Sequence, residues 1–450
     1  MMNLTLHEIA SAVDGILLGK DKLISEVCID TRSLKENALY IAIQGEQFDG
    51  HNFITQAAQQ GASALMVNRQ LASDLTQIIV KDTRLALGKL AALVRAKTDI
   101  KVCGVTGSNG KTTVKEMVAA ILSVNAEVLA TQGNLNNEIG VPLSLLNLTT
   151  EHEFAVIEMG ANHQGEIAYS SELARPDVAV INNIGRAHLE GFGSIEGIAR
   201  AKAEMLTALS ITGTAILNCD DDFFPLMKEI AGKRAVISFG FSEHADVRAE
   251  NRQLTLQANG FVSQFELVFQ QQRLQINLPL AGEHNIKNAL AATAACLALD
   301  ISLAQIKQGL QQMQAVTGRL QWQCTGSGLR IINDTYNANP SSLSVALEIL
   351  QASQQECWLV LGEFGELGEQ AQQLHENMGV EIKQAGVTRL FTTGVLTEKT
   401  VQTFGEGGQY FAEQTDLIST LLAEIRTDII VLVKGSRAQK MENVVAALLN

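Results

Sequence analysis

Cysteine, proline and aromatic residues are all scarce in this sequence. Only 5 of its 450 residues are proline and 5% are aromatic, and no low-complexity segment separates one region from the next. The six cysteines lie far apart and match neither a C-x-x-C motif nor a zinc-ligand spacing, so we expect buried, free thiols in a reducing compartment. They are Cys28, Cys103, Cys219, Cys296, Cys324 and Cys357.

A long apolar run and a basic N-terminal leader are also missing. Residues 289–299 form the most apolar stretch, which is too short to span a bilayer, and residues 1–8 carry no cluster of basic side chains. A formal net charge of −14 argues against a nucleic-acid or anionic-membrane surface. We therefore expect a soluble cytoplasmic protein without nucleic-acid or membrane partners, and we expect it to act as a monomer.

Short apolar runs alternate with helical patterns through most of the chain, which predicts an α/β fold. The length favours about three domains, and a chain that is 46% hydrophobic can bury several cores. We place a small α/β domain at residues 1–81, a central domain with a parallel, doubly wound sheet at 82–316, and a Rossmann-like domain at 317–450. A polar, strand-like stretch at 248–278 predicts an antiparallel insertion in the central domain.

Strands are predicted where short runs of apolar residues occur. Ligands bind outside the carboxyl ends of parallel strands, so the residues just after these runs are candidates for a site. The runs cover residues 38–43, 64–67, 102–105, 155–157, 178–181, 215–217, 236–239, 329–332, 358–361, 390–392 and 429–433.

The segment after the first central strand is the most informative part of the sequence. Gly107 and Gly110 allow a tight turn whose N–H groups point inward. Lys111 can reach nucleotide phosphates, and Thr112 can offer its hydroxyl to Mg²⁺. The spacing is a T-G-x-x-G-K-T-T variant of the Walker pattern, and with a strand before it and a helix after it the loop predicts binding of a nucleoside triphosphate. It consists of Thr106, Gly107, Ser108, Asn109, Gly110, Lys111, Thr112 and Thr113.

Polar residues follow two other predicted strands of the central block. Glu158 comes directly after one strand, and His188 lies a few residues after another. A carboxylate, an imidazole and the Thr112 hydroxyl would make a hard-cation site beside the phosphates. Taken alone, Glu158 is equally well explained as a solvated strand-end carboxylate, and a single histidine is more often structural.

An inward-facing lysine is predicted in the helical pattern that begins at Ile195. Ile198, Ala199 and Leu206 continue its apolar face, and Lys202 occupies the same face. Burial would lower the pKa of this amine. The side chain is either a stem whose charged tip reaches water or an uncharged amine open to modification, and periodicity does not decide between them.

The C-terminal block has polar residues of its own at a strand end. Asn339 and Pro340 are explained as the N-cap and first residue of a helix. Capping does not explain Asp334, Tyr336 and Asn337, which lie between the strand and that helix. These three residues are therefore candidates for ligand binding.

A basic turn follows the last predicted strand. Lys434 and Arg437 offer positive charge suited to a carboxylate or phosphate, and the glycine between them allows close backbone approach. A solvated basic turn explains the same residues equally well.

Together these segments resemble the ATP-dependent Mur ligases over essentially the whole chain. The resemblance implies a UDP-substrate-binding domain, a central ATP-binding domain and a C-terminal ligase domain. The motif N-D-T-Y-N-A-N-P and the absence of D-N-P-R favour the members that add D-alanyl-D-alanine to UDP-N-acetylmuramoyl-tripeptide. The similar motifs are D-T-R-S at 30–33, D-G-H-N-F-I at 49–54, the loop at 106–113, A-K-A-E at 201–204, G-E-H-N at 282–285 and N-D-T-Y-N-A-N-P at 333–340.

The resemblance implies ATP and Mg²⁺ as cofactors and an acyl-phosphate mechanism. Lys111 would hold the ATP phosphates, and Thr112 and Glu158 would bind one Mg²⁺. His188 and a carbamylated Lys202 would bind a second. The tripeptide carboxylate would attack the γ-phosphorus, and the dipeptide amine would then displace phosphate.

The resemblance also implies contacts with ATP and with the two other substrates. Asn288, Arg319 and Asp334 would contact ATP, and Lys434 and Arg437 would handle the dipeptide or close the site. The remaining substrate-binding residues are predicted to be Thr31, Arg32, Ser33, Asp49, Gly50, His51, Asn134, Asn137, Tyr336 and Asn337.

Two other functions stay open on the sequence. A sister ligase would add one amino acid to a UDP-muramyl or folate-like acceptor, although the missing D-N-P-R motif argues against the most similar of these. A P-loop NTPase of another class would use its nucleotide state to gate a binding surface. Against that function, no separate Walker-B aspartate follows an apolar run in the central block.

Overall fold

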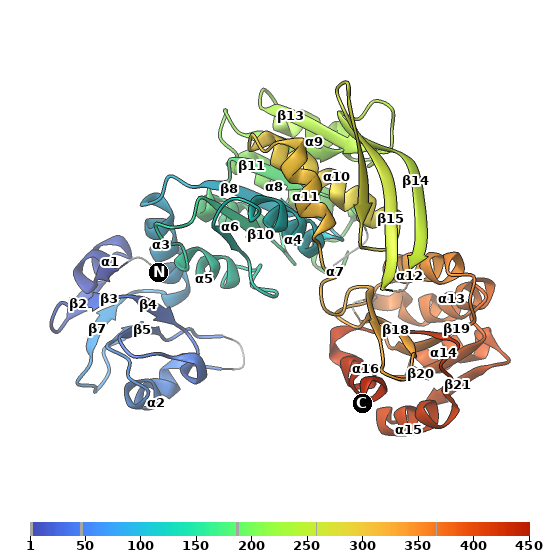
Figure 1. Cartoon of the computed structure of the whole chain (residues 1–450). Helices are drawn as coiled ribbons and strands as arrows, with labels where there is room; N and C mark the ends of the chain where they lie inside the picture. The colour runs from blue at the N-terminus through green and yellow to red at the C-terminus, as the bar shows by residue number, and fades with distance from the viewer. Residues whose placement is uncertain (1–2, 46–47, 186–188, 258, 366) are drawn as a thin grey trace. The chain divides into compact units, whose positions relative to one another are not determined.

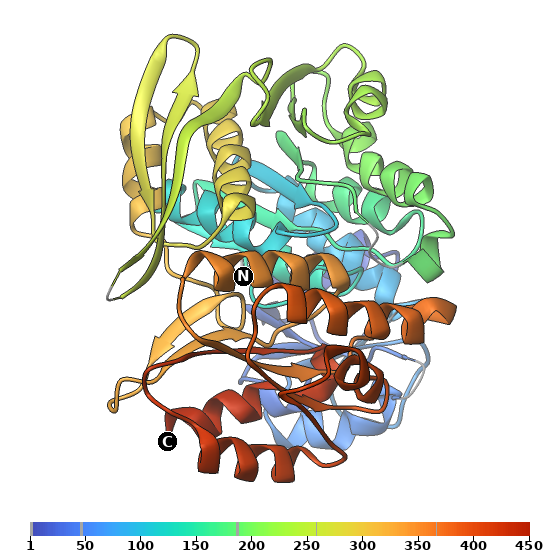
Figure 2. The same ribbon diagram turned by 90° about the vertical axis from the view of Figure 1, so that its right-hand side faces the viewer.

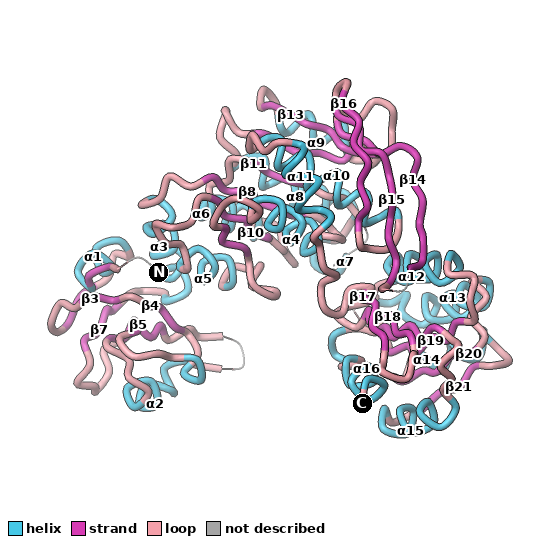
Figure 3. The backbone as a smooth tube through the Cα atoms, in the orientation of Figure 1, coloured by secondary structure: helices cyan, strands magenta, loops and turns pink. Residues whose placement is uncertain are grey.

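The computed structural model describes residues 3–45, 48–185, 189–257, 259–365 and 367–450, and Figures 1 and 3 show their helices and strands. The chain forms two compact units. The first comprises Met1–Ile184, Ala199–Ile237 and Ala294–Ile301, and the second comprises Gly185–Ile198, Ser238–Thr293 and Ser302–Asn450.

The N-terminal part of the first unit is a small α/β layer built on a 5-stranded sheet. The edge strand β2 runs antiparallel to β7, and the other strands are parallel. Tyr40 and Leu65 are buried in the core of this sheet. The strand predicted at 64–67 is confirmed, and the one predicted at 38–43 is present but ends at Ile41. The sheet order is β2 (Ile16–Leu18), β7 (Thr76–Ile79), β6 (Ala64–Val67), β5 (Ala38–Ile41) and β4 (Glu26–Cys28), with helices α1 (Leu6–Ala12) and α2 (Ile54–Gln59) beside it and a short β1 (Leu4–Thr5) and β3 (Leu23–Ile24) pair.

The rest of the first unit is a parallel sheet with helices in its crossovers. Strand β8 lies at its centre, and all its residues after Lys101 are buried because both faces of the sheet are covered. In the ladders Glu158 of β10 lies opposite Val105, and Ile181 of β11 lies opposite Thr106, so these strands end at one edge. The order is β9 (Val128–Ala130), β10 (Phe154–Glu158), β8 (Lys101–Thr106), β11 (Val178–Ile181) and β12 (Thr214–Asn218). The helices are α3 (Thr83–Ala96), α4 (Lys111–Leu122), α5 (Gly140–Leu146), α6 (Glu166–Ala174), α8 (Ile195–Ala208) and α9 (Phe224–Ala231).

The second unit contains an antiparallel region within Ser238–Thr293, as the sequence predicts for residues 248–278. Strand β13 (Ala235–Gly240) leads into it, and β14 pairs with β15 and β15 with β16 in antiparallel ladders. The hairpin of β14 and β15 is the long yellow-green ribbon in Figure 2. These strands are β14 (Val247–Gln257), β15 (Gly260–Phe269) and β16 (Gln272–Leu278), and the nearby helices are α7 (Leu189–Phe192), α10 (Glu283–Ala298) and α11 (Leu303–Gln311).

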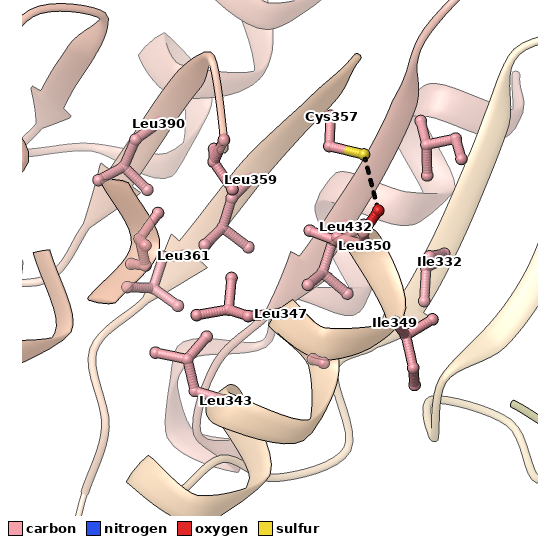
Figure 4. Packing of buried hydrophobic residues seen from close by; sticks show 14 of the residues in the cluster. Ile332, Leu343, Leu347, Ile349, Leu350, Cys357, Leu359, Leu361, Leu390 and Leu432 are labelled. Atoms are coloured by element: carbon pink, nitrogen blue, oxygen red, sulfur yellow. Dashed lines mark hydrogen bonds between the residues drawn. The ribbon is translucent and has the colours of Figure 1, made fainter. Parts of the chain in front are cut away.

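The C-terminal part of the second unit is a 6-stranded sheet between two layers of helices. Leu343 and Leu347 of α12 pack against Leu359 and Leu361 of β19 in one buried cluster (Figure 4). Helices α15 and α16 bury the other face. The order is β17 (Gln321–Cys324), β18 (Arg330–Asp334), β22 (Ile430–Lys434), β19 (Cys357–Gly362), β20 (Arg389–Thr393) and β21 (Gly408–Phe411), all parallel except β17. The helices are α12 (Pro340–Ala352), α13 (Ala371–Gln384), α14 (Thr397–Phe404), α15 (Gln414–Glu424) and α16 (Glu442–Leu449).

Helix α12 begins where its capping residues predict. The Asn339 side chain accepts the backbone N–H of Ser342 at 2.9 Å, and the Ser342 hydroxyl accepts that of Asn339 at 3.1 Å. Pro340 is the first helical residue, where no intrahelical donor is needed.

All six cysteines are free, as predicted, but not all are buried. Cys324 is exposed because it ends β17, the edge strand of its sheet, and Cys219 is half-buried. The expectation of buried thiols was therefore wrong for these two residues. Burial raises the pKa of the Cys103 thiol to about 12. Within the described residues, the structure has no helix with the length and apolarity to cross a membrane.

Candidate active site

The glycine-rich loop joins β8 to α4 as predicted. Gly110, the N-cap of α4, has a φ of +78°, which glycine adopts without strain. It has no side chain to cap the helix, and the N-terminus of a helix is a favourable position for an anion. At Gly107 a Cβ would lie 3.0 Å from Cβ of Asn182, so this close approach also requires glycine.

Two asparagines after β11 hold the loop in shape. The carbonyl and side chain of Asn183 accept the backbone N–H groups of Ser108 at 2.9 Å and Asn109 at 2.8 Å. The side-chain amides of Asn182 and Asn183 both donate to the Asn109 carbonyl at 3.0 Å. The loop is thus preorganised from the adjacent parallel strand.

Lys111 lies folded over this loop. Its Nζ donates to the carbonyl of Gly107 at 2.8 Å and to that of Ser108 at 3.3 Å. The positive charge of Lys111 therefore lies over the turn where α4 begins. This arrangement suits a triphosphate whose oxygens also accept loop N–H groups.

Glu158 fits a role as a cation ligand. Its side chain is buried, and Asn136 Nδ2 donates to its Oε1 at 2.7 Å. Its Oε2 is buried and has no hydrogen-bond partner among the residues that the structure describes. A buried carboxylate oxygen without a donor is costly unless a cation neutralises it. Thr112 lies on α4, which follows β8, the strand paired with β10. The Glu158 carboxylate oxygen and the Thr112 hydroxyl are hard oxygen ligands of the kind that Mg²⁺ prefers.

Lys202 is buried, as the helical periodicity predicts. It is 3% exposed, and Ile198, Ala199 and Leu206 on the same face are buried, whereas Ile195 at the start of the helix is exposed. Burial, together with the positive charge of Lys111, lowers the pKa of the Lys202 amine to about 7. The burial argues against a stem whose tip reaches water. His188, the other predicted ligand of this group, lies outside the described residues.

The predicted UDP-site residues lie on two loops of the N-terminal sheet. Arg32 is exposed and its guanidinium pairs with Asp30 at 2.6 Å, while Thr31 is buried and the Ser33 hydroxyl donates to the Asp30 carbonyl. Tyr40 lies near both loops, and burial, together with the charges of Cys28, Asp30 and Asp49, raises its pKa to about 12.

His51 is a buried part of the second of these loops. Its Nδ1 lies 2.6 Å from Asp49 Oδ1, and its Nε2 accepts the backbone N–H of Asn68 at 3.2 Å. Both ring nitrogens are thus used within the protein. At Gly50 a Cβ would lie 2.8 Å from the backbone nitrogen of Ile43, so a side chain does not fit there.

Three asparagines follow β9, and they make different contacts. They are Asn134, Asn136 and Asn137. Asn134 and Asn137 are exposed, and the Asn137 side chain also accepts the backbone N–H of Gly140 at the start of α5 at 2.8 Å. Asn136, which the sequence did not single out, is the one whose amide contacts Glu158.

Asp334 and Lys434 form a buried ion pair in the second unit. They lie opposite each other at the last position of the β18–β22 ladder, and Lys434 Nζ lies 2.5 Å from Asp334 Oδ2. The other oxygen of Asp334 accepts the backbone N–H of Leu320 at 3.1 Å. Both side chains are largely removed from water.

Arg319 and Tyr336 stack on each other in the second unit. The Arg319 guanidinium carbon lies 4.4 Å above the Tyr336 ring, and the Tyr336 backbone N–H donates to the Gly318 carbonyl. Asn337 is exposed. Arg437 is also exposed and pairs with Glu442 at 3.0 Å. Asn288 is buried on α10, where its amide donates to the Asn285 side chain at 3.1 Å.

The chain matches three family models along its length. They are the "Mur ligase family, catalytic domain" at residues 23–95, the "Mur ligase middle domain" at 105–296 and the "Mur ligase, glutamate ligase domain" at 318–437. The chain is 43% identical to UDP-N-acetylmuramoyl-tripeptide–D-alanyl-D-alanine ligase of Escherichia coli K12, over 100% of this chain and 99% of that protein. It belongs to the Mur ligase family.

Solved structures agree with this assignment. The crystal structure of MurF from Acinetobacter baumannii superimposes with a TM-score of 0.93 at 38% identity, over 100% of this chain and 99% of that one. The structure of MurF ligase from Thermotoga maritima in complex with ADP has a TM-score of 0.82 at 28% identity, over 94% and 96% of the two chains.

The buried pair of this Mur ligase leads to a prediction about stability. We expect Asp334→Ala to lower the free energy of unfolding by about 3–5 kcal/mol, because it leaves the Lys434 ammonium buried without a counter-charge. Urea unfolding followed by tryptophan fluorescence measures this, since both tryptophans, Trp322 and Trp358, lie in the C-terminal part. The double variant Asp334→Ala/Lys434→Met should show a smaller decrease in the free energy of unfolding, because it leaves no unpaired buried charge. Equal losses in the two variants would contradict the expectation.

Proposed function

We propose that this Mur ligase joins D-alanyl-D-alanine to UDP-N-acetylmuramoyl-tripeptide with conversion of ATP to ADP and phosphate. The observation that carries the proposal is the pairing of a preorganised phosphate loop with a buried carboxylate oxygen that has no donor among the described residues, at one edge of one sheet. The name of the E. coli relative supports the choice of substrates. The T. maritima ligase, whose structure is a complex with ADP, supports ATP as the phosphate donor.

The first step needs charge neutralisation, because a carboxylate must approach a triphosphate. Lys111 and the N–H groups at the start of α4 bind the phosphates and stabilise negative charge during phosphoryl transfer. The tripeptide carboxylate oxygen bonds to the γ-phosphorus as the bond from that phosphorus to the β–γ bridging oxygen breaks, and ADP is the leaving group. Thr112 and Glu158 would hold one Mg²⁺, and His188 with carbamylated Lys202 would hold a second. Mg²⁺ supplies charge neutralisation on the phosphate oxygens.

The second step forms the amide bond. The amine of the dipeptide attacks the acyl carbon, the bond from that carbon to the phosphate oxygen breaks, and the amine loses a proton. Asn288, Arg319 and Asp334 are proposed to contact ATP, and Tyr336, Asn337, Lys434 and Arg437 to bind the dipeptide. The proposed UDP-substrate contacts are Thr31, Arg32, Ser33, Asp49, Gly50, His51, Asn134 and Asn137.

The domain boundaries, the cellular location and the oligomeric state are part of the same proposal. The three domains are taken to end near residues 81, 316 and 450. A precursor linked to UDP and a supply of ATP are both found in the cytoplasm, so the enzyme is proposed to act there, as a monomer.

The test of the function is the dependence of phosphate release on substrates. We expect release only when ATP, UDP-N-acetylmuramoyl-tripeptide and D-alanyl-D-alanine are all present, because the acyl phosphate forms on one substrate and is consumed by the other. Free lysine or diaminopimelate should not replace the dipeptide, and the UDP-linked dipeptide should not replace the tripeptide. Phosphate release from ATP alone would instead indicate an NTPase, and addition of one amino acid to the UDP-linked dipeptide would indicate a sister ligase.

A further inference from the structure

Helix α6 is capped by a side chain from another helix. Its N-cap is Gly165, which has a φ of +88° and no side chain of its own. The carboxylate of Glu204, on α8, accepts the backbone N–H of Gly165 at 2.8 Å and that of Ala168 at 3.0 Å. One glutamate therefore satisfies the two donors that a local capping box would satisfy, and it places negative charge at the positive end of the helix.

Glu204 lies two residues after Lys202 on α8. Side chains two positions apart on an α-helix project about 200° apart, so Glu204 holds the side of α8 opposite to Lys202. Its two hydrogen bonds fix the rotation of α8 about its axis. A rotation of about 10° would move the tip of a lysine side chain by roughly 1 Å, which is enough to matter for a metal ligand or a reacting group.

The segment that Glu204 holds begins at Glu158. Residues 159–165 connect Glu158 to α6, and Met159 and Gly160 are tied at the start by backbone bonds to Val105 and Asn136. The far end of the segment is tied by Glu204. The chain from Glu158 to Gly165, the hydrogen bond to Glu204 and the two-residue step along α8 from Glu204 to Lys202 therefore form a continuous path. It joins two residues that the proposed function makes metal ligands.

We propose that Glu204 is a positioning residue that sets the place of Lys202 relative to Glu158, so that a carbamate on Lys202 and the Oε2 atom of Glu158 can hold metal at the same nucleotide. The inference rests on the proposed function. Glu204 does not touch substrate and acts through α8. Its loss should weaken binding of divalent metal, as the loss of groups that orient metal ligands commonly does.

The test compares Glu204→Ala with a matched variant, Glu166→Ala. Glu166 also accepts backbone N–H groups in this connection, from Asn162 at 2.8 Å and from His163 at 3.4 Å. It lies on α6 itself, and among the described residues it makes no hydrogen bond to α8. We expect Glu204→Ala to weaken Mn²⁺ binding in the presence of ADP about 10- to 100-fold, measured by electron paramagnetic resonance. We also expect a weaker carbamate signal in ¹³C NMR with labelled bicarbonate. Glu166→Ala should stay within about twofold of the wild type in both, since it leaves α8 in place.

Several outcomes would overturn the inference. Wild-type Mn²⁺ affinity in Glu204→Ala together with a lower melting temperature would mean that the cap serves stability alone. An equal loss of metal affinity in Glu166→Ala would mean that the effect comes from the conformation of residues 159–165 and not from the position of α8. Glu204→Gln, which keeps one acceptor oxygen and the shape of the side chain, serves if the alanine variant does not fold, and it should show a smaller loss of the same kind. Absence of ATP-dependent ligation by the wild type would reject the proposed function instead, and would be seen in the substrate test.

Discussion

Replacement of Lys111 by alanine should abolish ligation and leave the fold intact. The Lys111 ammonium donates to carbonyls of its own loop and stands where the phosphates of ATP are proposed to bind. Its removal takes away charge that is needed most when the γ-phosphoryl group transfers, so turnover should fall about 10³-fold or more, or about 4 kcal/mol. Phosphate release and circular dichroism measure the two expectations.

Lys101→Ala is the control for that variant. Lys101 begins β8, the strand that leads into the loop, and is exposed. Its Nζ lies 3.5 Å from Asp177, at the end of β8 far from the loop. It should keep near-wild-type activity. Ligase activity in folded Lys111→Ala would reject the assignment of the ATP site.

Lys202→Ala should lose activity that acetate partly restores. The amine is buried, and its lowered pKa of about 7 leaves a large neutral fraction at neutral pH that can react with carbon dioxide. The resulting carbamate would supply the oxygens of a metal ligand, so its loss should cost about 100-fold or more in turnover. Acetate can enter the vacated volume and supply a carboxylate there. Phosphate release with increasing acetate measures the rescue.

The pH dependence of the carbamate has a definite sign. Below pH 7 the amine of Lys202 is mainly protonated and cannot add to carbon dioxide, so wild-type enzyme stripped of bicarbonate should regain activity on its addition at pH 8 and much less at pH 6. Full activity in Lys202→Ala, or an unmodified lysine in the mass spectrum of bicarbonate-treated native enzyme, would exclude the carbamate.

Much of the fold follows from apolar runs. Successive side chains of a strand point to opposite faces, so a strand that is buried on both faces needs consecutive apolar residues. Strand β11 has the bounds that Val178–Ile181 predicts. By contrast β21 (Gly408–Phe411) was not predicted: it is a short edge strand, and the sequence G-Q-Y-F has no continuous apolar run. Edge strands are covered less on either face, so their sequences carry a weaker signal.

The candidate site was predictable where one element fixes its geometry. The loop after β8 and the inward direction of Lys202 follow from local spacing and helical period. Asn136 has no such signal, because a loop has no period that selects it from Asn134 and Asn137. The pair of Asp334 and Lys434 joins residues 100 positions apart, and only the order of the strands brings them together.

The exposed thiol at the end of β17 has a practical consequence for spectroscopy. Burial raises the pKa of the Cys103, Cys296 and Cys357 thiols, so few of them are thiolate at neutral pH, and maleimides react with the thiolate. Cys324 is exposed, so we expect it to react with a maleimide faster than the buried thiols. The natural chain can therefore carry a fluorophore on its C-terminal sheet without an engineered cysteine. An acceptor dye on the UDP-linked substrate would then report, by energy transfer, the distance between that sheet and the bound substrate.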